Sequence, residues 1–124
     1  MASSAFSHTE RIAQILEEIE CLRSGVEPPL PEAIDEAKSL LSSVHYHIPE
    51  GDVFEINQGV QVNWWEGNLH LRLFCSGLGS GSYIYKARTE DGEISSKEVI
   101  PDPSGRTLEV LLQELVADQP MLFA

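Results

Sequence analysis

The chain is poor in basic residues, and this shortage limits what it can bind. Its 124 residues include eight lysines and arginines against 20 aspartates and glutamates, so the formal net charge is −12. Proteins that bind duplex nucleic acid regardless of sequence neutralise its phosphates with lysine and arginine. We therefore expect no duplex nucleic-acid partner, and the acidity favours a basic protein as the partner instead.

Cysteine and long apolar runs are scarce as well. Cys21 and Cys75 are the two cysteines of the chain. They are too few for a disulfide framework and lack the spacing of a metal site. No stretch approaches the ~20 apolar residues that a membrane-spanning helix needs, and the first residues lack the basic start and apolar run of a signal peptide. These absences predict a cytoplasmic protein that does not enter a membrane.

What is present is the composition of an ordinary globular protein. With 42% hydrophobic and 23% charged residues, a chain of this length can bury one core without a metal ion or disulfides. We expect residues 1–124 to form a single domain, and we predict no metal site and no cofactor.

Apolar residues recur every three to four positions near both ends of the chain. This spacing places them on one face of a helix, and it predicts helices over residues 8–24, 31–44 and 105–117. Pro31 suits the first turn of the second helix, where the N–H that proline lacks would have no partner.

Between residues 52 and 100 the apolar period is two, which is typical of strands. The expected strands are Val53–Asn57, Val60–Trp65, Asn68–Cys75, Ser82–Thr89 and Glu93–Ile100. Glu66-Gly67 and Asp91-Gly92 suit two-residue hairpin turns, because glycine adopts positive φ without strain. The order predicts an α+β fold: two N-terminal helices, an antiparallel β-meander of four to five strands and a C-terminal helix, with the helices packed on one face of the sheet.

Two adjacent tryptophans in one expected strand must point to opposite faces of the sheet. A Glu66-Gly67 turn would pair Trp65 with Asn68 and Trp64 with Leu69. One face of this hairpin is then entirely apolar, with Val60, Val62, Trp64, Leu69, Leu71 and Leu73. We therefore predict that Trp64 lies in the core and that Trp65 lies on the outer face.

The second expected hairpin carries several basic residues. An Asp91-Gly92 turn would pair Lys86 with Lys97 and Arg88 with Ser95, which makes this strand face basic. The opposite face, predicted to be the core side, carries Tyr83, Tyr85, Ala87, Ile94, Ser96, Glu98 and Ile100. If both hairpins share one sheet, the basic face joins the face of Trp65. The predicted binding residues are Trp65, His70, Arg72, Lys86, Arg88 and Lys97.

Two interpretations of this outer face stay open. Lysine and arginine often occupy solvated strand positions, where they protect sheet edges, and Trp65 can lie against Arg72 or under a chain end. Alternatively, an exposed tryptophan among basic and amide side chains has the composition of an interface anchor. A shallow site for single-stranded nucleic acid, with bases stacked on the ring, is disfavoured by the net charge.

We predict no catalytic residues, so the chain is not expected to be an enzyme. His45 and His47 lie close together, but two histidines without a third ligand are a weak metal signal. The glycine-rich residues 76–81 run into a strand, whereas a phosphate-binding loop precedes a helix. His70 and Cys75 are five residues apart in one strand, which places them on opposite faces and disfavours a Cys–His couple.

Residues 29–34 (PLPEAI) and Leu40-Leu41, followed by the GVQVNW strand at Gly59–Trp64, resemble a group of short bacterial proteins of unknown role. Those proteins also have a proline-containing entry to a helix, a glycine-led strand that ends in tryptophan, and then a meander. The resemblance covers residues 28–90, and it implies a bacterial or phage-like origin without implying an activity.

The leading hypothesis is a small acidic protein that binds and inhibits another protein, as antitoxins, immunity proteins and phage anti-defence inhibitors do. The alternative is a module that binds a ligand or single-stranded nucleic acid on the outer sheet face around Trp65. A small hydrolase or metal enzyme built on His45, His47 and nearby acidic residues is a third, weaker interpretation. A homodimer is compatible with each of them.

Overall fold

The computed structural model describes residues 8–44, 51–77 and 81–117. This part of the chain forms three α-helices, one short 3-10 helix and a five-stranded sheet. The helices are α1 (His8–Cys21), η1 (Leu22–Ser24), α2 (Pro31–Ser42) and α3 (Gly105–Ala117). None of these described helices combines the length and the apolar character that a bilayer crossing requires. The N-terminal helix pair and the C-terminal helix predicted from the sequence are confirmed.

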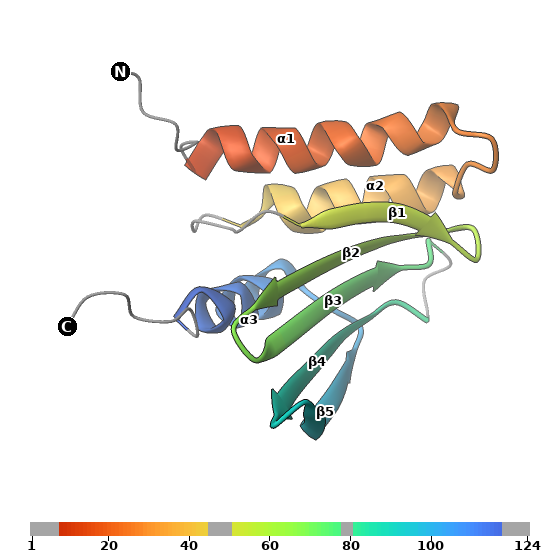
Figure 1. Ribbon diagram of the computed structural model, residues 1–124. Coiled ribbons are helices and arrows are strands. Elements are labelled where there is room, and N and C mark those ends of the chain that lie inside the picture. The colour runs from red at the N-terminus through yellow and green to blue at the C-terminus, as the bar shows by residue number, and fades with distance from the viewer. Residues whose placement is uncertain (1–7, 45–50, 78–80, 118–124) are drawn as a thin grey trace.

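The sheet is a meander in which each strand pairs with the next one along the chain. The strands are β1 (Asp52–Ile56), β2 (Gly59–Glu66), β3 (Leu69–Cys75), β4 (Tyr83–Glu90) and β5 (Glu93–Pro101). All four pairings are antiparallel, so the spatial order equals the chain order. Figure 1 shows the strands in this order, with β1 nearest to α1 and the β4–β5 hairpin farthest from it. The predicted α+β class is confirmed.

The core lies between one face of the sheet and the helices. Its helical side consists mainly of Ile15, Ile19, Ala33, Ile34, Ala37, Leu41, Leu108, Leu111, Leu112 and Leu115. Its sheet side includes Val60, Val62, Trp64, Leu69, Leu71, Leu73 and Ile84. Trp64 has no exposed surface. The six-residue apolar face predicted for the first hairpin is therefore the core side, and Trp64 is the core tryptophan.

The turn between β2 and β3 differs from the predicted one. Glu66 pairs with Leu69, so the two-residue loop is Gly67-Asn68 rather than Glu66-Gly67. Gly67 has a φ of 58°, and a glycine at the first central position accepts this value, whereas the predicted loop would have required it of Glu66. Each residue of β2 therefore pairs with a residue of β3 two positions later than predicted, so that Trp65 pairs with His70 rather than with Asn68. Because the total displacement is two, every side chain keeps its predicted face.

The prediction for the faces of β4 is wrong. Leu73 pairs with Ile84, Leu71 with Lys86, and Leu69 with Arg88. Directly paired residues share a sheet face, so these residues of β4 lie on the helix side. Ile84 is fully buried there.

The tyrosines of β4 consequently lie on the other side of the sheet. Tyr83 and Tyr85 pair with Phe74 and Arg72 of β3, respectively. The predicted core side of β4 is therefore the side that faces away from the helices. The short Ile84 side chain fills the space beneath the helices better than a tyrosine would, because a buried tyrosine hydroxyl needs a hydrogen-bond partner.

A bulge changes the pairing of β4 with β5. The predicted Asp91-Gly92 turn is present, with φ values of 55° and 82°. Thr89 then pairs with Ile94, but Arg88 pairs with Ser96, which leaves Ser95 as the extra residue. The predicted partners are therefore wrong beyond the bulge, and each residue of β4 opposes a residue one position later in β5. Lys86 faces Glu98 and Ala87 faces Lys97.

The start of the β3–β4 connection is attached to α2. The carboxylate of Glu36 accepts hydrogen bonds from the Gly77 backbone N–H (3.1 Å) and the Ser82 hydroxyl (2.8 Å). Gly77 has a φ of 75° and lies so close to α2 that an added Cβ would collide with the Ala33 backbone. This contact holds α2 against one end of the sheet.

Candidate binding surface

The sheet face turned away from the helices is the candidate site, and we call it the open face. Its members on β1 to β3 are Asp52, Phe54, Ile56, Gln61, Asn63, Trp65, His70, Arg72 and Phe74. Its members on β4 and β5 are Tyr83, Tyr85, Ala87, Thr89, Ile94, Lys97 and Val99. No described helix packs on this face, because the helices contribute their buried residues to the core on the other side. It is aromatic and apolar, with few charges.

Aromatic rings contact one another across the strands of the open face. The Trp65 and His70 rings stack with centroids 4.5 Å apart and planes inclined by 3°. The edge of His70 meets Tyr85, with centroids 5.8 Å apart. Phe74 and Tyr83 form a second pair at 5.4 Å. These contacts form a chain of rings across β2, β3 and β4.

A buried amide supports this chain of rings from below. Asn63 is only 3% exposed, and its Oδ1 accepts from His70 Nε2 (3.1 Å) and from Arg72 Nε (3.3 Å). Because this oxygen only accepts, His70 carries its proton on Nε2. The Arg72 guanidinium also lies over the Tyr85 ring, 5.2 Å from its centroid. Both side chains are therefore held in place by contacts within the protein.

Burial lowers the pKa of His70 below its ordinary value, and the nearby positive charge of Arg72 lowers it further. Both effects disfavour the charged imidazolium. His70 is therefore a neutral ring at neutral pH, stacked on Trp65 as an aromatic surface rather than as a cation.

Large apolar side chains remain exposed on the open face. Trp65 is 57% exposed, Ile94 57% and Val99 58%. Elsewhere in the described part of the chain, the exposed large apolar residues are Val26, in the connection between η1 and α2, and Val110 on α3. Several exposed apolar groups on one face are typical of an interaction site, whereas single ones are common on any surface.

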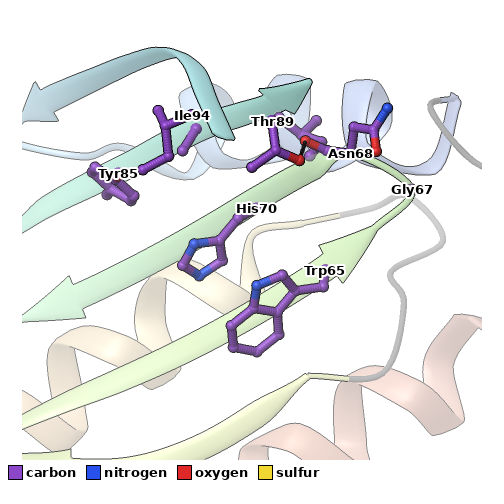
Figure 2. Close-up of a pocket in the computed structure, with 9 residues that line it drawn as sticks. Trp65, Gly67, Asn68, His70, Tyr85, Thr89 and Ile94 are labelled. Atoms are coloured by element: carbon purple, nitrogen blue, oxygen red, sulfur yellow. Dashed lines mark hydrogen bonds between the residues drawn. The ribbon is translucent and has the colours of Figure 1, made fainter. Parts of the chain in front are cut away.

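The open face contains a small pocket beside Trp65. Its volume is about 150 Å³. The lining residues are Trp65, Gly67, Asn68, Leu69, His70, Tyr85, Ala87, Thr89 and Ile94. Figure 2 shows the Trp65 and His70 rings on one side and Tyr85, Thr89 and Ile94 on the other. The Thr89 hydroxyl donates to the Asn68 carbonyl (3.4 Å) and closes the end near the turn.

The structure separates the residues predicted to form the binding site. Trp65 and His70 line the pocket, while Arg72 and Lys97 lie elsewhere on the open face. Lys86 and Arg88 lie on the opposite, helix side of the sheet, so the predicted cluster of basic residues around Trp65 is wrong.

Lys86 and Arg88 bind the same carboxylate of α3. Lys86 Nζ is 2.9 Å and 3.0 Å from the two oxygens of Glu114, and Arg88 is 3.1 Å from one of them. The hydrogen bond from Lys86, with a further one from Arg88, lowers the pKa of Glu114. These two cations therefore attach the β4–β5 hairpin to α3.

Sequence reasoning missed the contribution of β4 to the open face. Tyr83 and Tyr85 were expected in the core, yet both are partly exposed and contact other rings. A signal was present, since tyrosine combines an apolar ring with a polar hydroxyl and is enriched at interfaces. The alternation of Tyr83-Ile84-Tyr85 alone fits either orientation.

The other chemistry considered from the sequence gives no site in the described residues. Cys75 is buried on the core side, and burial raises the pKa of its thiol. His70 lies on the opposite face, as predicted from their spacing. The described residues hold no group of three or more side chains able to bind a metal ion. His45 and His47 lie outside the described residues.

Comparison with known protein families, curated proteins and solved structures finds no match to this chain. The resemblance to short bacterial proteins therefore stays a prediction.

Proposed function

We propose that this protein is non-catalytic, that it binds another protein through the open face, and that this binding inhibits or sequesters the partner. The observation that carries the proposal is the exposure of Trp65, 57% of which is accessible on a sheet face without helical cover in the described part of the chain. Tryptophan and tyrosine are the side chains most enriched among residues that dominate binding energy. Here Trp65, Tyr83 and Tyr85 lie on paired strands of one sheet.

The preorganisation of the open face supports a binding role. Trp65 stacks on His70, and His70 is bonded to the buried amide of Asn63. Side chains that already hold one conformation lose little entropy when a partner arrives. A held tryptophan with an accessible surface is therefore suited to act as an anchor.

The charges of the open face favour a protein over single-stranded nucleic acid as the ligand. Its described basic residues are Arg72 and Lys97, and Arg72 already contacts Asn63 and Tyr85. Sites for single strands combine stacking rings with a positively charged groove that follows the phosphates. Lys86 and Arg88 bind Glu114 on the other side of the sheet. The described residues of the open face therefore provide too few positive charges for such a groove.

The net charge of −12 bears on how a partner approaches. Long-range attraction favours a partner of opposite net charge and speeds its association. We therefore propose a partner with a basic surface overall, whose contact with the open face is mainly apolar. An antitoxin or immunity protein that inhibits a basic protein would have a partner of this kind.

Two exposed valines provide a matched test. Val99 lies on the open face and is 58% exposed, whereas Val110 lies on α3 and is 55% exposed. The wild type, Val99→Asp and Val110→Asp are expressed with a tag in the native host, and the captured proteins are quantified. We expect Val99→Asp to lose a specific partner that Val110→Asp retains, with both variants melting close to the wild type. Loss of that partner with Val110→Asp alone would refute the proposal.

A further inference from the structure

The pocket on the open face exists because a small residue lies between larger ones. His70, Ala87 and Lys97 form one row across β3, β4 and β5. Ala87 has only a methyl group, and it lines the pocket together with Trp65 and Ile94. Figure 2 shows Trp65 and Ile94 on opposite sides of the pocket. Ala87 is 3% exposed, so it forms the floor.

The size and lining of this pocket restrict what it can hold. Pockets for drug-sized ligands and cofactors measure roughly 300–1,000 Å³, whereas this one measures about 150 Å³. It therefore suits one bulky side chain rather than a whole cofactor. The stacked faces of Trp65 and His70 and the side chain of Ile94 offer apolar contacts to such a group.

One cation lies beside the pocket without a carboxylate partner among the described residues. Lys97 pairs directly with Ala87 of the pocket floor and is exposed. The described ion pairs join Lys86 and Arg88 to Glu114, Arg23 and Lys38 to Glu20, and Arg23 to Asp35. The flexible stem of Lys97 lets its ammonium group reach a carboxylate held above the rim.

We propose that this pocket binds a bulky apolar side chain of the partner protein that stands next to an acidic group. The apolar group enters between the Trp65–His70 stack and Ile94, and the carboxylate pairs with Lys97. This inference rests on the proposed function and adds the chemistry of the recognised segment. The recognised segment is expected to be acidic rather than basic, because the exposed charge beside the apolar opening, that of Lys97, is positive.

A small probe can test the pocket without the natural partner. 3-Phenylpropionate carries an aromatic ring and a carboxylate, and 3-phenylpropylamine carries the same ring with a positive charge. Each is titrated into the full-length protein while the backbone amide resonances are followed by NMR. We expect 3-phenylpropionate to shift the resonances of Gly67, Asn68, Ala87, Thr89 and Ile94, and the amine to bind more weakly.

Two variants separate the apolar and charged parts of the inference. Ala87→Leu fills the floor and should abolish the shifts, while Lys97→Gln should weaken binding about two- to fivefold, the usual effect of an exposed ion pair. Lys97 is exposed, so its replacement leaves the fold intact even if Ala87→Leu does not fold. Equal binding of acid and amine, shifts that lie elsewhere, or no shifts with millimolar probe would overturn the inference.

The outcome for the pocket is distinguishable from the outcome for the proposed function. If the probe does not bind but Val99→Asp still loses its partner, the inference about the pocket is wrong and the open face remains the binding surface. If the probe binds and Val99→Asp retains every partner, the proposed function is wrong, while the pocket's preference for acidic apolar groups stands.

Discussion

The indole of Trp65 and the imidazole of His70 lie face to face, with centroids 4.5 Å apart and planes 3° apart. The two residues are direct cross-strand partners on β2 and β3. One face of the indole is therefore covered by His70 while more than half of the side chain is exposed. This arrangement fixes the ring on the open face and leaves its remaining surface exposed.

The neighbouring tryptophans should have opposite effects when each is replaced by alanine. Trp64→Ala should lower the free energy of unfolding by about 3–5 kcal/mol, because it leaves a cavity in the core. Trp65→Ala should cost much less, since 57% of Trp65 is exposed. Urea unfolding of both variants measures the difference.

Leu71→Ala is the control for this comparison, because Leu71 is also fully buried on the core side. It should lose about 2–5 kcal/mol. Equal losses for Trp64→Ala and Trp65→Ala would mean that Trp65 is buried in solution, under another segment or in a dimer. The open face would then not be open.

Stability should depend on the protonation of His70. Its folded-state pKa lies below the ordinary value of 6.5, because of burial and the charge of Arg72. The unfolded chain therefore binds more protons in this range, so the stabilisation is complete above pH 6.5 and is lost as the pH falls toward the folded pKa.

The measurement compares wild type and His70→Gln by urea unfolding between pH 8 and pH 5. The other histidines and the carboxylates are common to both proteins, so their contributions cancel in the difference. Wild type should lose more stability than His70→Gln as the pH falls. Parallel curves for the two proteins would show that His70 is solvated rather than held beside Arg72.

Much of the fold is predictable from the sequence because local patterns determine it. Apolar spacing locates the helices, and a two-residue turn limits how β2 and β3 pair. Even with the turn misplaced by one residue, Trp64 and Trp65 keep their faces, because the displacement of the pairing is two. The identity of the buried tryptophan is thus insensitive to the error.

The face of β4 could not be predicted, because it depends on contacts between distant segments. The connection from β3 to β4 is too long for a turn to fix the pairing, so the two hairpins have no common reference in the sequence. Lys86 and Arg88 share the helix side with buried Ile84, and there both bind Glu114 of α3, a residue far along the chain. The bulge at Ser95 likewise lacks a glycine or proline to mark it.

Removing the carboxylate of Glu114 should weaken the attachment of the β4–β5 hairpin. Glu114→Gln keeps the shape of the side chain, and it should lower the free energy of unfolding by about 1 kcal/mol at pH 7, because partly exposed ion pairs contribute little more. Glu93→Gln, on the exposed end of β5, should have almost no effect.

This difference should also disappear in acid. The folded-state pKa of Glu114 lies below the ordinary value of 4.5, chiefly because Lys86 donates a hydrogen bond to it. The stabilisation is therefore complete above pH 4.5 and is lost as the pH falls through the folded pKa. A gap between wild type and Glu114→Gln that persists unchanged at pH 2 would contradict the ion pairing.

Two glycines with positive φ allow the contact between α2 and the β3–β4 connection to be tested. Gly77 has a φ of 75° and is packed against Ala33, whereas Gly92 has a φ of 82° with nothing near an added Cβ. Gly92→Ala should cost about 1–2 kcal/mol from backbone strain alone. Gly77→Ala should cost more, because the methyl group also collides with α2, and thermal unfolding measures both. Equal losses would place this connection away from α2.

The most direct test of the open face as the binding surface is site-specific photo-cross-linking in the native host. p-Benzoylphenylalanine is placed at Val99 on the open face or at Val110 on α3, two positions with nearly equal exposure of 58% and 55%. We expect a specific cross-linked protein from position 99, none from position 110, and loss of the product when Trp65→Ala is added. The same product from position 110 alone, or its persistence at position 99 with Trp65→Ala, would contradict binding through the open face.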